Sequence, residues 1–212
     1  MLREHLAARG IVDVYILSAF RGVPREAFVP PNLVGLAYED NPLDIGSGQT
    51  ISQPYTVAFM TQLLDPKPGD TVLEIGTGSG YQAAIISRLC RKVYTIERFE
   101  DLAKKAVGIL KKLKYGNVEV IVGDGSLGLP SVALAKDGFD GIIVTAAAPG
   151  IPRPLLEQLK VGGRLVIPVT VSTGLKIMQE MLKITKTEKG FQEERYPGFR
   201  FVPLVGKHGY DK

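Results

Sequence analysis

The stretch TVLEIGTGSGYQAA, residues 71–84, passes from an apolar run through Glu74 into three alternating glycines, Gly76, Gly78 and Gly80. An unbroken run of aliphatic and β-branched residues favours a buried strand. Glycines tolerate positive φ angles and let a ligand lie directly against the backbone. The stretch therefore predicts a strand, a tight turn and the start of a helix, with the turn forming a ligand cradle.

The spacing of these glycines narrows the choice of ligand. The dinucleotide pattern G-x-G-x-x-G requires a glycine where the chain has Tyr81, and no glycine loop continues into the Gly-Lys-Ser/Thr of a phosphate-binding loop. The remaining pattern, E-x-G-x-G-x-G, resembles motif I of the Rossmann-like methyltransferases that depend on S-adenosylmethionine. Glu74 would repel a pyrophosphate, but it could organise the loop or accept a hydrogen bond from an ammonium group. A tight turn without a ligand is the alternative interpretation.

Strands and helices are predicted to alternate after this motif. Further strands are indicated at residues 91–97, 118–122, 141–144 and 164–169, and helices at 100–113 and 152–163. This alternation predicts a mostly parallel sheet flanked by helices, with ligands at the carboxyl ends of the strands. The polar residues at those ends are Glu74, Glu97, Asp124 and Thr145. Glu97 lies 17 residues beyond Gly80, where a carboxylate can accept both ribose hydroxyls or simply begin the next helix.

We expect one structural domain in three parts. Residues 1–68 form a helical extension with an active-site loop, 69–170 the cofactor-binding core, and 171–212 a hairpin with a substrate-facing strand. Polar residues between glycines and Pro54 make the segment 40–54 either a site or a surface linker. The C-terminal strands are predicted to begin at Leu175 and to turn at Lys189-Gly190. The tail, with His208 and Tyr210, is expected to be mobile and the His208 side chain solvated.

Composition excludes several classes of protein. The chain has 212 residues, 45% of them hydrophobic, and its net charge of +4 comes from 26 basic and 22 acidic residues that are interspersed. Such dispersed charge predicts no nucleic-acid partner. A single cysteine, Cys90, permits no internal disulfide, and the N-terminus lacks the apolar core of a signal peptide. No apolar run approaches the roughly 18 residues of a membrane span, so we expect a cytoplasmic protein without membrane attachment.

Together these motifs resemble one family, the protein-L-isoaspartate (D-aspartate) O-methyltransferases. The resemblance runs from about Arg25 to Gly206 and rests on REAFVP (25–30), PLDIGSGQTISQP (42–54), VLEIGTGSGYQAA (72–84), TIER (95–98), GDG (123–125), TAAAP (145–149), GGRLVIP (162–168) and RFVPLVG (200–206). Motif I is shared by many methyltransferases, whereas GQTISQP and FVPL are specific to this family. The fold implied is α/β and Rossmann-like, with N-terminal helical and C-terminal β additions.

The resemblance also implies an activity and a set of site residues. The expected reaction transfers a methyl group from S-adenosyl-L-methionine to the free α-carboxylate of L-isoaspartyl residues in damaged proteins and peptides, with the β-carboxylate of D-aspartyl residues as a second acceptor, and leaves S-adenosyl-L-homocysteine. Ser52 is implied as the catalytic residue, and Ser52, Val202, Pro203 and Leu204 as substrate-binding residues. The implied cofactor-binding residues are Thr50, Ile51, Glu74, Gly76, Thr77, Gly78, Glu97, Arg98, Asp124, Gly125 and Thr145. The sequence departs from the family pattern at two positions that concern substrate binding. Phe59 stands where many bacterial members have a basic residue, and Gly150 stands where an acidic residue often follows the proline of TAAAP.

This reaction suits a chain with only two histidines, His5 and His208, neither of which lies in a motif. A carboxylate acceptor is ionised at neutral pH, so no general base is needed and positioning is the main task. Ser52 would then orient one carboxylate oxygen rather than act as a nucleophile. A nucleic-acid amine methyltransferase is disfavoured because TAAAP contains no acid and no aromatic residue, and a nicotinamide oxidoreductase because of Tyr81. A binding module that keeps the fold without turnover is a further alternative.

Overall fold

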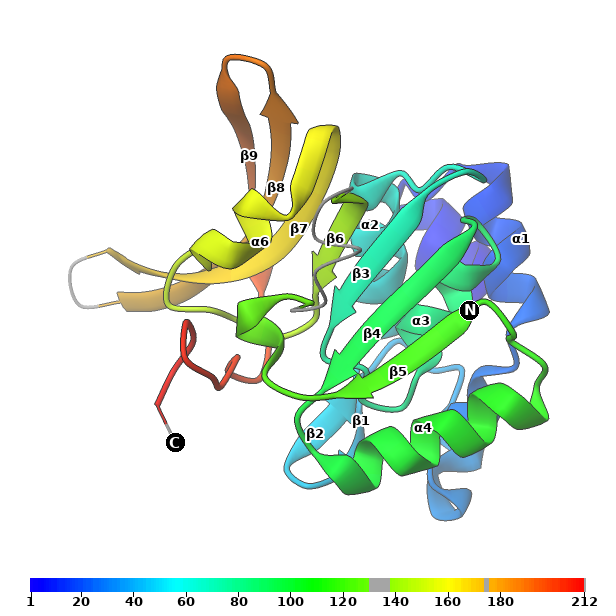
Figure 1. Cartoon of the computed structure of the whole chain (residues 1–212). Coiled ribbons are helices and arrows are strands. Elements are labelled where there is room, and N and C mark those ends of the chain that lie inside the picture. Colours follow the sequence, from blue (N-terminus) through cyan, green and yellow to red (C-terminus); the bar gives the residue numbers. More distant parts are fainter. Residues whose placement is uncertain (130–137, 174–175, 212) are drawn as a thin grey trace.

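A seven-stranded sheet in the order β5-β4-β3-β6-β7-β8-β9 runs through the whole molecule (Figure 1). The computed structural model describes residues 1–129, 138–173 and 176–211. The strands of this sheet are β3 (Thr71–Ile75), β4 (Lys92–Glu97), β5 (Val118–Val122), β6 (Phe139–Val144), β7 (Leu159–Thr173), β8 (Lys176–Thr187) and β9 (Gly190–Phe199). The pairs from β5 to β7 are parallel, whereas β8 and β9 are antiparallel additions at one end.

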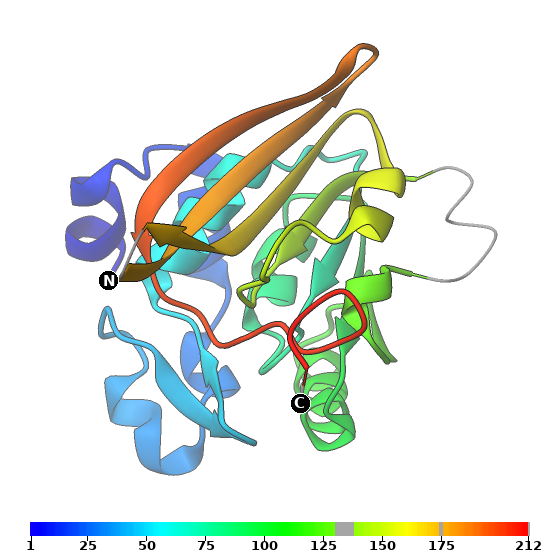
Figure 2. The same ribbon diagram turned by 90° about the vertical axis from the view of Figure 1, so that its left-hand side faces the viewer.

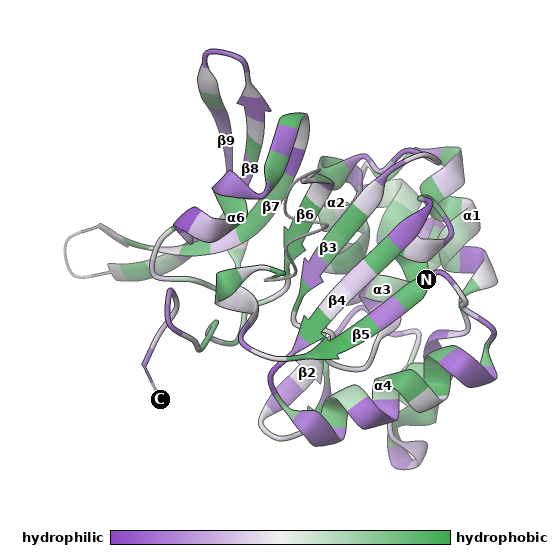
Figure 3. Ribbon diagram, viewed as in Figure 1, coloured by the Kyte–Doolittle hydropathy of each residue, from purple (hydrophilic) through white to green (hydrophobic). Residues whose placement is uncertain are grey.

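Two hydrophobic layers cover the parallel strands. The helices are α1 (Val14–Gly22), α2 (Pro54–Leu64), α3 (Tyr81–Ser87), α4 (Glu100–Lys112) and α6 (Arg153–Glu157), with single turns at Leu2–Leu6, Ala7–Arg9, Arg25–Phe28, Pro31–Leu36 and Gly125–Leu127. Side chains of α2 and α3, such as Met60 and Ile86, pack on Val72 and Ile143 at one face. Leu155 of α6 packs with the other face. In Figure 3, β6 is hydrophobic along most of its length, whereas α4 alternates between hydrophobic and hydrophilic residues. This arrangement confirms the predicted α/β fold with a mostly parallel sheet.

The boundaries differ from the sequence-based expectation at two places. The helix expected over 152–163 ends at Glu157, and β7 already begins at Leu159. Leu159 pairs with Phe139, but the next pair joins Arg164 to Gly141, so the two glycines at 162–163 form a bulge inside a strand rather than a helix stop. The segment 40–54 contains an antiparallel hairpin of β1 (Leu43–Gly46) and β2 (Gln49–Ile51) that the sequence did not predict.

The C-terminal tail is packed against the core, contrary to the mobility expected from its position. Backbone N–H groups of Lys207 and His208 donate to Asp124 (2.8 Å) and to the Ser126 hydroxyl (3.0 Å), and the Tyr210 hydroxyl contacts Thr170 at 2.7 Å. Figure 2 shows this red segment looping beside the carboxyl end of the sheet. The His208 side chain itself is exposed, as expected. The predicted β8–β9 hairpin is present, although Leu175, its expected start, lies outside the described residues.

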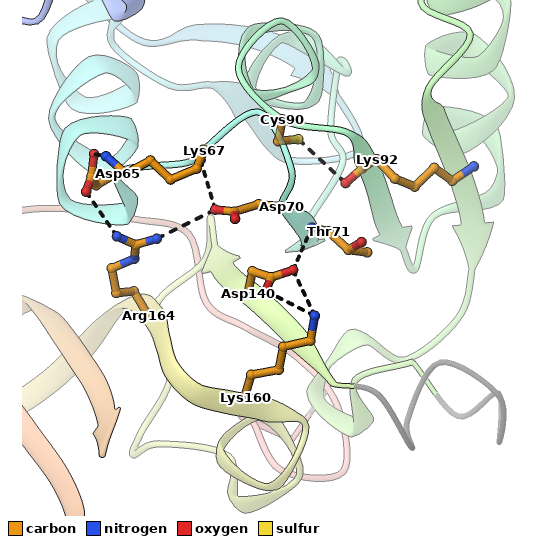
Figure 4. A network of polar contacts seen from close by, with 9 residues as sticks. All are labelled: Asp65, Lys67, Asp70, Thr71, Cys90, Lys92, Asp140, Lys160 and Arg164. Carbon is orange, nitrogen blue, oxygen red and sulfur yellow. Dashed lines mark hydrogen bonds and ion pairs between the residues drawn. The ribbon is translucent and has the colours of Figure 1, made fainter. Parts of the chain in front are cut away.

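A polar network joins the amino ends of the central strands (Figure 4). Asp140 accepts a hydrogen bond from the Thr71 N–H at 2.8 Å and pairs with Lys160 at 3.0 Å. Although partial burial raises the pKa of Asp140, these contacts lower it below its ordinary value overall. Arg164 bridges Asp65 (3.0 Å) and Asp70 (3.6 Å). These contacts fix β3, β6 and β7 relative to one another at the edge opposite the glycine loop.

Within the described segments, no helix is long and apolar enough to cross a membrane.

Candidate active site

The glycine loop joins the carboxyl ends of three strands. The Gly76 N–H donates to the Ile96 carbonyl of β4 at 2.8 Å, and the Thr145 hydroxyl after β6 donates to the Gly76 carbonyl at 2.7 Å. Gly76 has a φ of +96°, and a Cβ at this position would lie 2.4 Å from the Thr145 hydroxyl oxygen. Only glycine therefore lets the chain turn here while β3, β4 and β6 remain adjacent.

Glu97, at the end of β4, braces the same loop. Its carboxylate accepts hydrogen bonds from the Gly78 N–H at 2.8 Å and the Phe99 N–H at 3.0 Å, and its residue is only 4% exposed. Each of its oxygens still has a lone pair for a further donor. The carboxylate therefore shapes the loop and can also accept from a bound ligand.

Glu74 is completely buried one residue before the end of β3. Its Oε2 accepts from the Thr95 hydroxyl at 2.5 Å, and the Thr95 hydroxyl lies 2.6 Å from that of Thr77 in the glycine loop. Burial raises the pKa of Glu74 to about 8; the Thr95 hydrogen bond opposes this shift, and the charge of Glu97 adds to it. Its Oε1 has no hydrogen-bond partner among the described residues. The geometry supports a role for Glu74 in organising the loop.

A buried arginine holds Ser52 in place. Arg25 is 0% exposed, and its guanidinium donates to the Ser52 carbonyl and the Ala37 carbonyl, each at 2.8 Å. Its Cζ also lies 4.7 Å from the centre of the Tyr81 ring. Burial lowers the pKa of Arg25, although the guanidinium stays protonated near neutral pH. In the described part of the chain, no carboxylate lies within ion-pair distance of it. The Arg25 guanidinium, which has no ion-pair partner among these residues, therefore fixes the segment between β2 and α2 that carries Ser52.

Most of the predicted site residues meet at one cavity beside the glycine loop. They are Thr50, Ile51, Ser52, Gly76, Thr77, Gly78, Glu97, Arg98, Gly125, Thr145, Val202, Pro203 and Leu204. The segment containing Val202 reaches this place because Ala147 exchanges two backbone hydrogen bonds with it, of 2.8 and 2.7 Å. The cavity thus draws its walls from the core and from both ends of the chain.

Two predicted residues do not line this cavity. Glu74 lies behind the loop, as described above, and Asp124 directs its carboxylate to Ser126 and to the backbone of Lys207. Partial burial raises the pKa of Asp124, but these hydrogen bonds lower it overall. Asp124 therefore fixes the turn that carries Gly125 and joins the tail to it.

Sequence reasoning did not assign several residues that line the same cavity. Tyr81 and Gln82 at the start of α3 and Phe99 after β4 all contribute to its wall. Arg25 begins the segment REAFVP (25–30), for which no site role is predicted from the sequence. The sequence gives no signal that separates Arg25 from its charged neighbours Arg21 and Glu26, because its burial depends on carbonyls that tertiary packing brings to it.

A second cavity adjoins the first. It lies between α2 and the end of β9, and it shares Thr50, Ser52, Thr145 and Val202 with the first cavity. A ligand in one cavity can therefore meet a ligand in the other only beside these four residues. Among the described residues, no cluster of His, Cys, Asp and Glu could hold a metal ion.

Comparison with known proteins assigns this arrangement to a family. The sequence model of the protein-L-isoaspartate (D-aspartate) O-methyltransferase family matches residues 1–209. Protein-L-isoaspartate O-methyltransferase 2 of Pelobacter propionicus is 52% identical over 99% of this chain and 91% of its own length. The corresponding enzyme of Methanoregula boonei is 51% identical over 100% of this chain and 94% of its own length.

Solved structures agree with the sequence comparison. A Plasmodium falciparum chain described as a beta-aspartate methyltransferase, crystallised with S-adenosyl-L-homocysteine, superposes with a TM-score of 0.80 at 27% identity and covers 96% of both chains. Another protein-L-isoaspartate O-methyltransferase gives a TM-score of 0.84 at 29% identity, covering 99% of this chain and 67% of that one. This chain belongs to the protein-L-isoaspartate (D-aspartate) O-methyltransferase family.

Proposed function

We propose that this protein methylates the free α-carboxylate of L-isoaspartyl residues in damaged proteins and peptides, and the β-carboxylate of D-aspartyl residues. The donor is S-adenosyl-L-methionine, and the products are a methyl ester and S-adenosyl-L-homocysteine. The observation that carries the proposal is the meeting of two cavities at Thr50, Ser52, Thr145 and Val202. One cavity is formed by the glycine loop and suits the donor, and the other opens toward the surface and suits a peptide.

The residues of the first cavity fit S-adenosylmethionine, which supplies a methyl group activated on a sulfonium. Glu97 has lone pairs free for ribose hydroxyls, and Gly125 lets the turn after β5 lie directly against Ile75, where a Cβ would come within 2.4 Å of that side chain. Glu74 does not line this cavity; buried behind the glycine loop, it supports the donor site through the hydroxyls of Thr95 and Thr77. The roles of these residues follow from their places in the site and stay proposals.

The acceptor side needs orientation more than proton transfer. A free carboxylate with a pKa of about 3.5 is ionised at neutral pH, so it can attack the methyl group of the donor without a general base. Neither His5 nor His208 lines either cavity. The Ser52 hydroxyl makes no hydrogen bond to the rest of the described chain and is only half-buried, so it is free to donate to one carboxylate oxygen. The second oxygen is then available for the transferred methyl group.

The surrounding chain holds the backbone of Ser52 in one position. Alignment of two reactants in a water-poor site can contribute several kcal/mol to a rate, about 7–11 in the best intramolecular cases. Here the hydrogen bond from Arg25 to the Ser52 carbonyl, together with Pro54 at the start of α2, restricts the backbone on both sides of the hydroxyl. The loop is therefore ordered before the acceptor arrives.

The proposal is tested by methyl transfer to a pair of peptides. The two peptides have the same sequence, but one contains an isoaspartyl linkage and the other a normal aspartyl linkage. With labelled S-adenosylmethionine we expect base-labile label in the first peptide only. Measurable binding of S-adenosylmethionine without label in either peptide would contradict the proposal and would favour a binding module without turnover.

A further inference from the structure

The second cavity carries features that the transfer of a methyl group to a carboxylate does not require. It extends away from Ser52 between α2 and the C-terminal end of β9, and Figure 2 shows β8 and β9 crossing in front of α2. Its walls are rich in aromatic side chains, namely Tyr55, Phe59, Tyr196, Phe199 and Phe201. These side chains pack in part against the core, and their remaining surface suits an apolar group better than a carboxylate.

The aromatic side chains form one connected cluster. The Phe59 ring lies 5.3 Å from Phe199 in a stacked arrangement, 5.9 Å from Tyr55 and 5.4 Å from Tyr196, measured between ring centres. Phe201 extends the cluster, 6.4 Å from Phe199. All five residues are only half-buried. The rings therefore hold one another in place while part of their surface remains free for a partner.

The groove contains one arginine without an ion-pair partner among the described residues. Arg9 lies 3.5 Å from the centre of the Tyr55 ring, but its charge is balanced by Asp40 at 2.6 Å. Arg200, also in the wall, is exposed and has neither an ion pair nor a side-chain hydrogen bond in the described part of the chain. The groove thus offers one uncompensated positive charge next to an apolar surface.

We propose that this groove, defined by Tyr55, Phe59, Tyr196, Phe199 and Phe201, binds an aromatic side chain of the acceptor polypeptide close to the isoaspartyl residue. The proposal rests on the proposed function and adds a sequence preference to it. The groove is continuous with the transfer site, so a chain whose carboxylate lies at Ser52 can extend along it. Aromatic side chains are largely buried in folded proteins, so the groove would favour acceptor segments that have lost their native packing.

The test compares two isoaspartyl peptides. One has phenylalanine two positions before and two positions after the isoaspartyl residue, and the other has glutamine at both positions. For the unaltered protein we expect a KM about tenfold lower for the phenylalanine peptide, because aromatic contacts in a desolvated site typically contribute a factor of this order. In Phe199→Ala the ratio of the two KM values should fall to about twofold or less, since Phe199 stacks on Phe59 and connects Phe201 to the cluster.

Phe191→Ala is the matched control. Phe191 lies on the same strand, is 49% exposed and lines neither cavity, so its removal should leave the tenfold ratio intact. Phe199→Leu keeps apolar volume without the ring and serves if Phe199→Ala does not fold. For Phe199→Leu we expect an intermediate ratio of about threefold.

The outcomes separate the two proposals. Methylation of both peptides with equal KM values by the unaltered protein would overturn the groove assignment and leave the proposed function intact. An unchanged tenfold ratio in both Phe199 variants would also overturn it, because the preference would then arise elsewhere. Methylation of neither peptide would overturn the proposed function itself.

Discussion

Replacement of Glu74 by glutamine isolates the effect of a buried carboxyl group on stability. Glutamine has nearly the same shape and retains an oxygen that can accept the hydrogen bond from Thr95, now 2.5 Å from the carboxylate. What changes is the ability to ionise. Because Glu74 is 0% exposed and forms no ion pair among the described residues, ionisation in the folded protein is unfavourable.

The size of the effect follows from the pKa values. Burial raises the pKa of Glu74 from an ordinary 4.5 to about 8 in the folded chain. A group with a raised folded pKa gives full stability below its unfolded pKa and loses it as the pH rises through the folded pKa. The full loss is about 5 kcal/mol, because each tenfold difference in the ionisation equilibrium between a pKa of 4.5 and one of about 8 is worth about 1.36 kcal/mol. Roughly 4 kcal/mol of it falls between pH 5 and pH 9.

The assay is thermal unfolding of both proteins across pH 5–9 without ligand. Subtracting the two curves removes the titration of every group except Glu74. We expect Glu74→Gln to gain about 4 kcal/mol on the unaltered protein over this range, which is about 8–16 °C in Tm for a domain of this size. The gain should level off above pH 8. Parallel curves for the two proteins would refute the reasoning, because they would mean that Glu74 ionises as easily in the folded chain as in the unfolded one.

Two further substitutions test how the acceptor site is built. Ser52→Ala should lower kcat by roughly 10- to 100-fold, the value of one hydrogen bond to a charged group, while calorimetry gives a Kd for S-adenosylmethionine within about twofold of the original. A large loss of cofactor binding would contradict this division of roles. Arg25→Met should destabilise the fold by about 2–4 kcal/mol in denaturant unfolding, because the carbonyls of Ala37 and Ser52 lose their donor. It should also reduce kcat/KM, and Arg25→Lys, which keeps the charge, should recover part of both losses; equal activity in all three proteins would contradict a positioning role.

The core of the fold was predictable because its signals are local. A run such as Thr71–Ile75 is apolar throughout, as a strand buried on both faces must be, and the glycines after it leave few alternatives to a tight turn. The carboxyl ends of neighbouring parallel strands meet at one edge, so Glu97 and Thr145 could be assigned to the site from the chain alone. The β1–β2 hairpin was missed because its strands are short and alternate with polar residues and glycine.

The contacts that were missed connect distant parts of the chain. Glu74 was expected to organise the loop or to accept from a ligand, but the hydroxyls that carry the effect belong to Thr95 and Thr77. The same is true of Asp124, whose partner Lys207 lies 83 residues away in a tail that has no pattern of its own. A sequence pattern reveals which side chains are polar at a strand end, but the choice among several partners depends on tertiary packing.

The two cavities differ in which parts of the chain form their walls, and this difference bears on how the donor and the acceptor are bound. The glycine loop and Glu97, which are expected to hold the donor, belong to the parallel core. The walls on the acceptor side come from the two additions: Ser52 is held from beneath by Arg25 of the N-terminal extension, and Val202 is held by Ala147 through the C-terminal segment. A change at a residue that lines only the second cavity can therefore alter the acceptor while the donor site is preserved. By this reasoning, substitutions at Phe199 should act on the KM for peptides and leave the affinity for S-adenosylmethionine unchanged, because Phe199 lines only the second cavity.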